Sequence, residues 1–413
     1  MEPLVPDTPP SGVEANVRKY YLFHLFLNLQ LWFPIWIIYL TEDRGLTLAQ
    51  VTLIDIPFWL CIVLLQIPGA ALADRFGRKP VLVTSAFTFA AAVVFFGLAN
   101  TFWLLMGAYL VWGVAFALLW GTESAFIYDS LKAIGREDEY QRIYGRGWAI
   151  ATAAQVAGTL AGAPIAAATS LQAPILASGG IALIAGFVAL TFKEPMVAIR
   201  TAHPSYGKIL SDSASLLRSR PDVRYAILYF GLVTVGSIAV VFFFQPFLVD
   251  HDVATGAVGV WQTPMRLAGI VAALSAHRLM RDFGERRTFY LMPVLIVVGY
   301  VSLAAWDSLW AQFAFILMNF SVILAQPTVT DYLNRRVPTE QRATLMSLTN
   351  LMRSAVLIPS APLLGLLADE ASPSTAYWTG GIIVAVVGIP LLALWLPSMG
   401  RNKEPDPAVE SAA

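Results

Sequence analysis

The chain has 413 residues, of which 57% are hydrophobic and only 13% are charged, and its formal net charge at pH 7 is zero. Soluble domains carry about 25% charged residues, so this composition excludes an ordinary soluble protein. The apolar residues gather in long runs that match the length of a membrane-spanning helix, and they do not alternate with polar residues as in a β-barrel strand. The sequence therefore predicts an all-α protein that crosses a membrane many times.

Twelve apolar segments follow one another along the chain, and each is long enough to span a bilayer as a helix. We place them at 20–40, 48–71, 80–99, 102–130, 143–168, 173–192, 223–249, 255–279, 288–306, 309–332, 342–367 and 375–397. The polar segment between the sixth and the seventh divides them into two sets of six. The expected domains are a disordered cytoplasmic N-terminus (1–19), a first six-helix bundle (20–192), a cytoplasmic linker (193–222), a second six-helix bundle (223–397) and a cytoplasmic tail (398–413).

The basic residues predict the orientation, because Lys and Arg collect on the cytoplasmic side of a membrane. With the N-terminus inside, all but three of the 27 Lys and Arg residues fall in cytoplasmic loops or at cytoplasmic helix ends. Arg44 falls outside, and Arg266 and Arg353 fall within spans. We therefore expect a multi-pass protein of the cell (cytoplasmic) membrane with both termini in the cytoplasm.

The two halves repeat each other in the same direction. "LADRFGRKP" (72–80) follows the second span and "LMRDFGERR" (279–287) follows the eighth, which places Gly77 and Gly284 207 positions apart. Asp129 and Asp331 end the fourth and the tenth span in a similar way. A parallel repeat of six helices is typical of one transporter architecture.

The first of these loops carries a family resemblance. "GAALADRFGRKPVLV" (69–83) resembles the signature loop of the major facilitator superfamily, with matches at Gly69, Asp74, Arg75, Gly77, Arg78 and Lys79. Together with the twelve spans and the repeat, the resemblance covers almost the whole chain. It implies two six-helix bundles around a central cavity lined by spans 1, 4, 7 and 10, and transport by alternating access.

The resemblance also implies a conformational latch. In relatives, the acid of the loop faces a helix of the other half, and a basic residue of the loop pairs with an acid at the end of span 4; Asp74, Arg78 and Asp129 occupy these positions. Two features depart from drug exporters that exchange with protons. Span 4 has no central arginine, and the glycine run of span 5 is blurred in "GTLAGAPIAA" (158–167), so its small residues indicate close helix packing.

Glu123 is the main candidate within a span, because an ionisable residue inside a membrane is a functional-site hypothesis by default. Steps of three and four residues back along its face of span 4 reach Leu119, Phe116, Trp112 and Tyr109, an aromatic stripe with one carboxylate near its cytoplasmic end. Glu123 could carry a coupling proton, or it could bind a cationic substrate group next to aromatic faces. The structural alternative is a carboxylate that pairs with Arg146.

Arg266 and Arg353 are the other candidates, because an arginine within a span faces a cavity or a partner. They could hold an anionic substrate group, one of them could pair with Glu123, or each could bond a fixed polar group. Weaker hydrogen-bonding candidates are Asn28, Trp32, Gln155, Gln245, Asn319 and Gln326. His24 is expected to face the membrane interface.

No phosphate-binding loop, nucleophile motif or histidine cluster is found in the sequence. We therefore expect no enzyme activity, no cofactor, no metal and no nucleic-acid partner. The expected partners are a small-molecule substrate, protons and the lipid bilayer, and the expected assembly is a monomer.

These observations predict a secondary active transporter that acts as a proton-coupled antiporter for the efflux of amphipathic or drug-like compounds. The alternative is proton-coupled uptake of an anionic nutrient or a vitamin-like solute. A sensor with the shape of a transporter is a third reading, and it would need a long soluble signalling domain that the loops do not provide.

Overall fold

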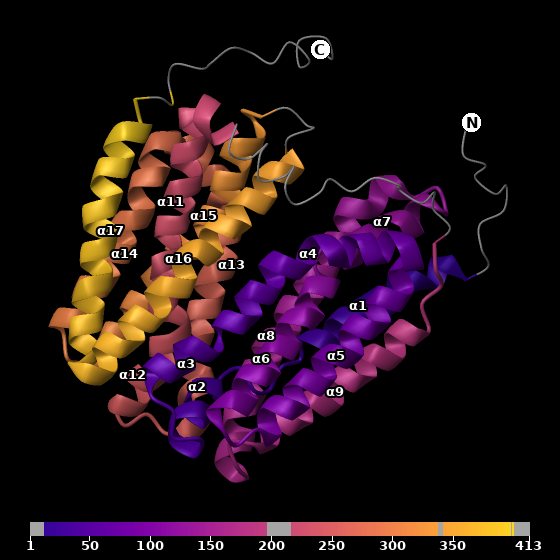
Figure 1. Ribbon diagram of the computed structural model, residues 1–413, viewed down its shortest axis with the longest axis horizontal. Coiled ribbons are helices and arrows are strands. Elements are labelled where there is room, and N and C mark those ends of the chain that lie inside the picture. Colours follow the sequence, from indigo (N-terminus) through magenta and orange to yellow (C-terminus); the bar gives the residue numbers. More distant parts are fainter. Residues whose placement is uncertain (1–11, 196–215, 338–341, 398, 400–413) are drawn as a thin grey trace. The chain divides into compact units, whose positions relative to one another are not determined.

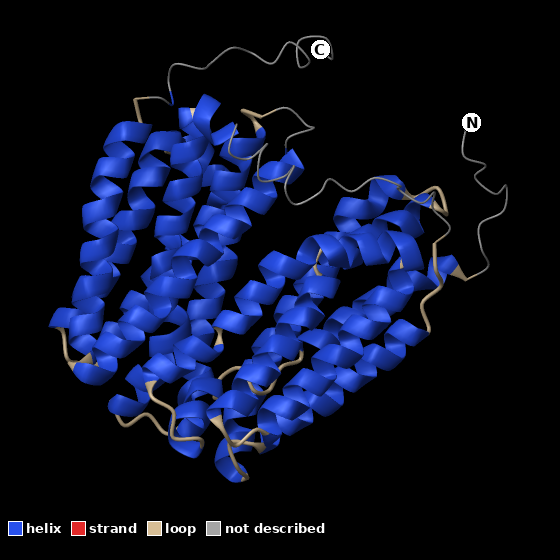
Figure 2. Cartoon of the chain, viewed as in Figure 1, coloured by secondary structure: helices blue, strands red, loops and turns tan. Residues whose placement is uncertain are grey.

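The computed structural model describes residues 12–195, 216–337, 342–397 and 399, and in these ranges the regular elements are helices (Figure 2). The predicted all-α class is confirmed. Eleven helical stretches of the described residues are long and apolar enough to cross a membrane. The expected first span is not among the eleven, because it is interrupted in its middle.

The chain divides into two compact units, which are described one at a time. Unit 1 holds the described residues up to 195 together with Phe242–Arg266, and unit 2 holds the remaining ones. The sequence places the boundary in the linker alone. The structure differs in one respect: the short stretch Phe242–Arg266, from the second half of the sequence, packs with the first half.

Unit 1 is a helical bundle in which the helices up to residue 190 run from indigo to magenta in Figure 1, and the helix Phe244–Asp250 is salmon. Helix α5 packs along α6 and α9, α4 packs along α6, and α1 packs against α8 and α9. The α-helices of this unit are α1 (Asn16–Asn28), α2 (Trp36–Ile38), α3 (Leu48–Ile54), α4 (Ile56–Phe76), α5 (Arg78–Leu98), α6 (Phe102–Leu119), α7 (Thr122–Lys132), α8 (Tyr140–Ala168), α9 (Ala173–Leu190) and α12 (Phe244–Asp250).

Unit 2 is a second helical bundle, in which α14 packs along α17 and α11 packs along α16. Helix α13 (Val258–Asp282) begins in unit 1 and continues into unit 2. The rings of Tyr229, Phe289 and Tyr332 surround Trp395, which is fully buried. The other α-helices of this unit are α11 (Pro221–Ile238), α14 (Gly284–Ala305), α15 (Phe313–Asn334), α16 (Arg342–Glu370) and α17 (Pro373–Trp395).

The interruption of the first span lies at residues 29–35, between α1 and α2, and we call this segment the span-1 break. Pro34 explains much of it. Proline has no backbone N–H for the helix ladder, and its ring disfavours helical dihedral angles in the preceding residue, here Phe33. A run of apolar residues long enough for one helix is therefore split into two pieces.

Side chains from elsewhere in unit 1 bond the backbone around the break. The hydroxyl of Ser178, in α9, accepts hydrogen bonds from the amides of Leu31 and Trp32 at 2.9 and 3.3 Å. The side-chain oxygen of Gln245, in α12, accepts from the amides at the start of α2, Ile37 at 2.9 Å and Ile38 at 3.4 Å. The same Gln245 side chain donates to the carbonyl of Phe33 at 2.9 Å. Non-helical backbone at membrane depth is tolerated only when its polar groups find such partners.

The small residues of span 5 make room for this backbone. An added Cβ at Gly158 would lie 2.8 Å from the carbonyl oxygen of Gln30, and one at Gly162 would collide with the carbonyl of Leu31. The incomplete glycine run of span 5 therefore permits close packing, as the sequence indicates. The segment that packs against it is the unwound backbone of the break and not a regular helix.

We expect Gly162→Ala to destabilise the protein by about 1–3 kcal/mol, the usual cost of overpacking. Thermal unfolding of the detergent-purified protein measures the effect as a lower midpoint temperature. Gly145→Ala in the same helix is the matched control. An added Cβ there meets nothing within 4 Å, and alanine favours the helix by up to about 1 kcal/mol. Equal midpoints for the two variants would show that the close contact at Gly162 does not limit stability.

Candidate functional site

One face of α1 carries a line of polar side chains at intervals of four residues. Asn16, Tyr20, His24 and Asn28 repeat at this spacing, which places them above one another on a helix. Asn16 donates to the hydroxyl of Ser130 at 3.0 Å. Tyr20, His24 and Asn28 belong to the two polar clusters described next.

The first cluster joins His24 to Glu123. The imidazole Nε2 lies 3.3 Å from a carboxylate oxygen of Glu123, and the two residues are only 2% and 6% exposed. The ring of Tyr20 meets the imidazole edge-on at 4.3 Å between centroids, and Trp148 lies at 6.1 Å. Burying a carboxylate is costly unless it is paired, and this imidazole is the partner that the structure gives it, in place of Arg146.

A second helix break explains the position of Glu123. Helix α6 ends at Leu119, and Gly121 adopts a positive φ of 88°, which a glycine accommodates without steric cost. Helix α7 then starts at Thr122, so Glu123 lies in its first turn, where the helix dipole stabilises negative charge. The expected continuous stripe from Tyr109 to Glu123 is therefore wrong. Helix α6 ends before Glu123, and the break separates the carboxylate from the aromatic residues.

Those aromatic residues pack mainly in the core of the unit. Trp112 lies edge-on to Phe89 and Phe96 at 5.6 and 6.0 Å between centroids. Tyr109 lies 5.8 Å from Phe96, and Phe116 lies 5.6 Å from Phe89. Trp112 has a further neighbour outside this core, because its ring lies 4.9 Å from that of Trp32 in the span-1 break.

The second cluster surrounds Arg266 at the span-1 break. Its Nη1 donates to the side-chain oxygen of Gln155 at 3.3 Å, and its guanidinium carbon lies 4.2 Å from the ring centroid of Phe33. The amide of Gln155 in turn donates to Asn28 at 3.0 Å, and Asn28 donates to the carbonyl of His24 at 2.9 Å. A chain of hydrogen bonds thus connects the arginine with the turn of α1 that carries His24.

Among the residues that the structure describes, the charge of Arg266 has no acid beside it. No carboxylate of the described residues forms an ion pair with it, and its Nε is buried without a hydrogen-bond partner there. An arginine at the centre of a membrane helix costs about 2.5–3.5 kcal/mol on insertion scales. The contact with Phe33 offsets about 0.5–2 kcal/mol of such a cost. The contacts among the described residues therefore offset only part of the cost of this charge.

The loop that resembles the family signature forms a third cluster, at one end of unit 1. Arg78 is in ion-pair contact with Asp129 through Nε, and its Nη2 lies 3.7 Å from Asp74. Gly69 is buried in α4, and Arg75 is exposed, with its guanidinium 5.2 Å from the ring of Phe76.

The start of the expected linker caps this loop. The carboxylate of Glu194 accepts from the backbone amides of Arg78 at 2.6 Å and Lys79 at 2.7 Å, the first residues of α5. Lys19 donates to the carbonyl of Thr191 at 2.5 Å close by. Partial burial, together with repulsion from Lys193 and Lys79, lowers the pKa of Lys19. This end of the unit is therefore crowded with positive charge, which the acids of the loop and of Glu194 offset.

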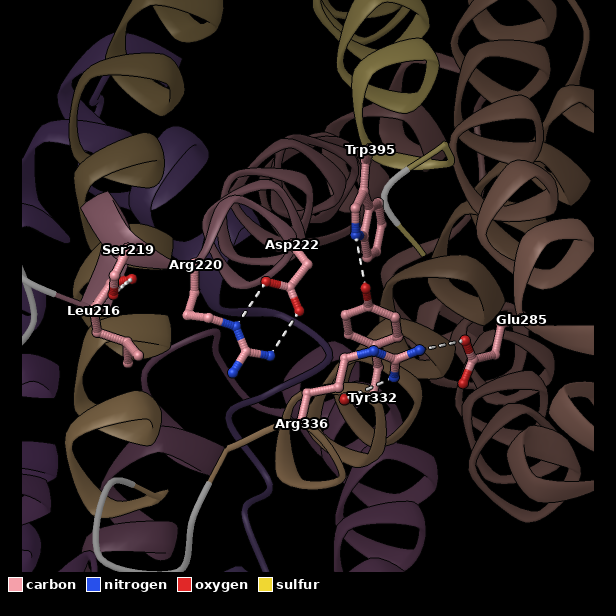
Figure 3. A network of polar contacts seen from close by, with 8 residues as sticks. All are labelled: Leu216, Ser219, Arg220, Asp222, Glu285, Tyr332, Arg336 and Trp395. Atoms are coloured by element: carbon pink, nitrogen blue, oxygen red, sulfur yellow. Dashed lines mark hydrogen bonds and ion pairs between the residues drawn. The ribbon is translucent and has the colours of Figure 1, made fainter. Parts of the chain in front are cut away.

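Unit 2 carries the same arrangement with the charges reversed. Glu285 follows Gly284 as Arg78 follows Gly77, and it binds Arg336 at 3.0 Å. The two members are 51 positions apart, the same separation as between Arg78 and Asp129. Arg336 also lies 3.6 Å above the ring centroid of Tyr332, whose hydroxyl accepts a hydrogen bond from Trp395 at 3.1 Å (Figure 3). Asp331 pairs instead with the exposed Arg335.

Three predicted site residues lie in unit 2. Arg353 is half-buried in α16, and Asn319 and Gln326 lie in α15, where Gln326 is exposed. Their roles stay predictions. Gln245 lies in unit 1, where its amide is used to bond the span-1 break.

Sequence reasoning missed His24, Phe33, Ser178 and Glu194 as members of these clusters. The spacing of four along α1 would have pointed to His24. The other three carry no such signal, because a phenylalanine, a serine and a glutamate are common residues whose contacts depend on tertiary packing. Among the described residues, no group of three or more His, Cys, Asp or Glu side chains is placed to hold a metal ion.

Comparison with known proteins agrees with this architecture. Over 380 residues, 88% of each chain, the sequence is 25% identical to the tetracycline resistance protein, class C, of Escherichia coli. Over 126 residues, 29% of each chain, it is 33% identical to a Na(+), Li(+), K(+)/H(+) antiporter of Planococcus maritimus. The crystal structure of the nucleoside transporter NupG matches 95% of this chain and 100% of its own with a TM-score of 0.76 at 13% identity, which shows a shared fold.

The family model of the Major Facilitator Superfamily matches residues 22–361, which is most of the chain. This family agrees with the helical fold, with the signature loop and with the relatives. The protein belongs to the Major Facilitator Superfamily and is a multi-pass membrane transporter, not an enzyme.

Proposed function

We propose that this transporter exports small amphipathic, drug-like molecules across the cytoplasmic membrane in exchange for protons. Alternating access between two six-helix bundles would move the substrate, with both termini in the cytoplasm and the monomer as the working unit. The observation that carries the proposal is the buried pair of His24 and Glu123.

The pair has the chemistry of a proton carrier. Imidazole changes its protonation in the physiological pH range, and a carboxylate next to it can hold or release a second proton. With one proton between them the pair has no net charge. Adding or removing a proton leaves a net charge among buried apolar and aromatic groups, which is costly in a low-dielectric environment. Protonation can therefore favour one conformation over another.

Export is supported by the tetracycline resistance protein among the relatives, and proton exchange by the partial match to an antiporter. Similarity to a nucleoside transporter at the level of fold leaves room for other substrates. The second candidate function is proton-coupled uptake of an anionic nutrient or a vitamin-like solute. Arg266 favours it, because its charge has no acidic partner among the described residues.

The ion pairs beside Gly77 and Gly284 are proposed to act as conformational latches. Removing one partner of a fully buried ion pair costs about 3–5 kcal/mol, because the other charge is left alone. The cost is lower for these two pairs, because Arg78 and Glu285 are partly exposed. A cost that falls on one conformation and not on another shifts the equilibrium between them. The pair of Arg78 and Asp129 would thus control how often the transporter changes state.

We expect Glu123→Gln and His24→Gln to abolish transport driven by a pH gradient while exchange of substrate without a gradient persists. Neither glutamine can carry the coupling proton, but neither blocks the path of substrate. The measurement is transport of tetracycline and ethidium in proteoliposomes, with and without an imposed pH gradient. Glu137→Gln, at an exposed acid, is the control and should behave like the wild type.

Two results would contradict this role. Loss of exchange along with gradient-driven transport in folded Glu123→Gln protein would make Glu123 a substrate ligand. An unchanged response to the gradient in both variants would remove the pair from coupling.

We expect Arg78→Gln to slow transport by about 5–150-fold, the range of a typical conformational coupling energy, and to leave ligand affinity unchanged. Combining Arg78→Asp with Asp129→Arg should restore part of the rate, because the opposite charges meet again. Initial transport rates and binding isotherms measure the two effects. Arg142→Gln, at an exposed arginine of α8 outside this loop, serves as the control. A loss of affinity equal to the loss of rate would disprove a purely conformational role.

A further inference from the structure

We propose that the span-1 break is a binding site for an organic acid with a flat ring, whose carboxylate binds the guanidinium of Arg266. The inference rests on the proposed transport function and names the substrate class and the place where it binds. The site is formed within unit 1 by α1, the break, α8 and the first part of α13.

Two buried donors of this site have no hydrogen-bond partner among the described residues. Arg266 uses Nη1 for one hydrogen bond of 3.3 Å to Gln155, while its Nε is buried without a partner among the described residues. The indole Nε1 of Trp32 is likewise buried without a partner there. Buried donors normally find an acceptor. Two such donors in neighbouring parts of one cluster therefore indicate a ligand that supplies oxygen acceptors.

The single positive charge of the site favours a ligand with a single negative charge. Arg266 is the charged member of a cluster whose other polar members, Asn28 and Gln155, are neutral amides. These amides are bonded in sequence and fix the guanidinium in one direction. A guanidinium presents a planar fork that matches a carboxylate with two parallel hydrogen bonds. One carboxylate would neutralise the site, whereas a phosphate dianion would leave a negative charge without a partner.

The aromatic residues select a flat ring. The guanidinium lies over the ring of Phe33, and Trp32 precedes Phe33 on the unwound backbone. Trp36 and Trp112 lie 6.4 and 4.9 Å from Trp32 between ring centroids. Aromatic rings attract one another in edge-on and offset arrangements over such distances. A conjugated ring attached to the carboxylate would therefore find neighbours on the side of the break.

The site combines partly exposed side chains with a fixed backbone. Asn28, Phe33, Gln155 and Arg266 are partly exposed, although they lie in or beside spans. The backbone that carries Phe33 is fixed by Gln245, and the start of α13 lies so close to α8 that an added Cβ at Gly259 would collide with the carbonyl of Thr159. Discontinuous helices form substrate sites in other transporters through the same exposure of polar groups at a break.

The proposed ligand site and the proton pair share one turn of α1. Asn28 donates to the carbonyl of His24 at 2.9 Å, and the same Asn28 accepts from the Gln155 that holds Arg266. Movement of this turn when His24 and Glu123 change their protonation would thus reach the guanidinium directly. Proton binding and release of the organic acid would be linked through this short chain.

The test is isothermal titration calorimetry of the detergent-purified full chain with benzoate, salicylate and 1-naphthoate, each compared with its neutral amide. We expect the acids to bind and the amides to bind at least about tenfold more weakly, since the amide lacks the charge that Arg266 recognises. Arg266→Gln should weaken binding of the acids at least tenfold and remove the preference for acid over amide. Arg266→Lys should retain part of it, because lysine keeps the charge without the planar fork.

Arg142→Gln, at an exposed arginine of α8, is the matched control and should bind the acids like the wild type. Phe33→Leu gives a second test if Arg266→Gln does not fold, and it should weaken 1-naphthoate more than benzoate. Failure of all three acids to bind at millimolar concentration, or equal affinity in wild type and Arg266→Gln, would overturn the proposal. Calorimetry measures binding without a pH gradient, so the binding site and the proposed function can fail separately. If the acids bind through Arg266 but the protein shows no proton-driven transport, the proposed function is wrong and the binding site stands.

Discussion

The structure of unit 1 depends on how the unwound backbone of the first span is satisfied inside a membrane. A peptide group without a partner costs several kcal/mol in hydrocarbon, so a non-helical stretch needs dedicated partners. Ser178 and Gln245 supply them with side-chain oxygens, and Gly158 and Gly162 let the carbonyls of the break approach α8. These residues come from α8, α9 and α12, which explains why the stretch Phe242–Arg266 packs with the first half of the chain.

Two helix breaks of unit 1 coincide with polar clusters. The break in the first span lies beside Arg266, and the break at Gly121 places Glu123 in the first turn of α7. A helix interruption exposes backbone dipoles and changes the direction of the following side chains, which makes a charged group less costly at that point. In unit 1, the same feature of the fold thus creates two places where charge is held away from water.

The two units carry one ion pair each at equivalent positions, but with opposite order of charge. Arg78 contacts Asp129 in unit 1, and Glu285 contacts Arg336 in unit 2. A repeat preserves the geometry of such a contact as long as the two charges remain complementary, so an exchange of both partners is tolerated. The aromatic support differs, since Arg336 also lies over Tyr332 while Arg78 has the second acid Asp74 beside it. The pairs therefore need not be equally strong.

The sequence by itself determined the class of the protein. Runs of apolar residues, the repeat of the loops at Gly77 and Gly284, and the charge distribution depend on local composition, and they identified a helical membrane protein of two related halves. The sequence also pointed to Arg78 and Asp129, which the structure places in contact, and to Glu123 and Arg266 as charges within spans. Such charges stand out because a bilayer tolerates few of them.

Only the tertiary structure decided what these charges meet. The imidazole of His24 reaches Glu123 because α1 packs against α7, and Gln155 reaches Arg266 because the start of α13 lies against α8. Pro34 indicated that the first span could be interrupted. The length of the break could not be predicted, because it depends on side chains of distant helices that accept hydrogen bonds from the backbone amides. Hydropathy gives the free-energy cost of transferring each residue out of water, without regard to the residues around it. The partner that offsets this cost is a property of packing between segments far apart in the chain, and that is why it appeared only in the folded molecule.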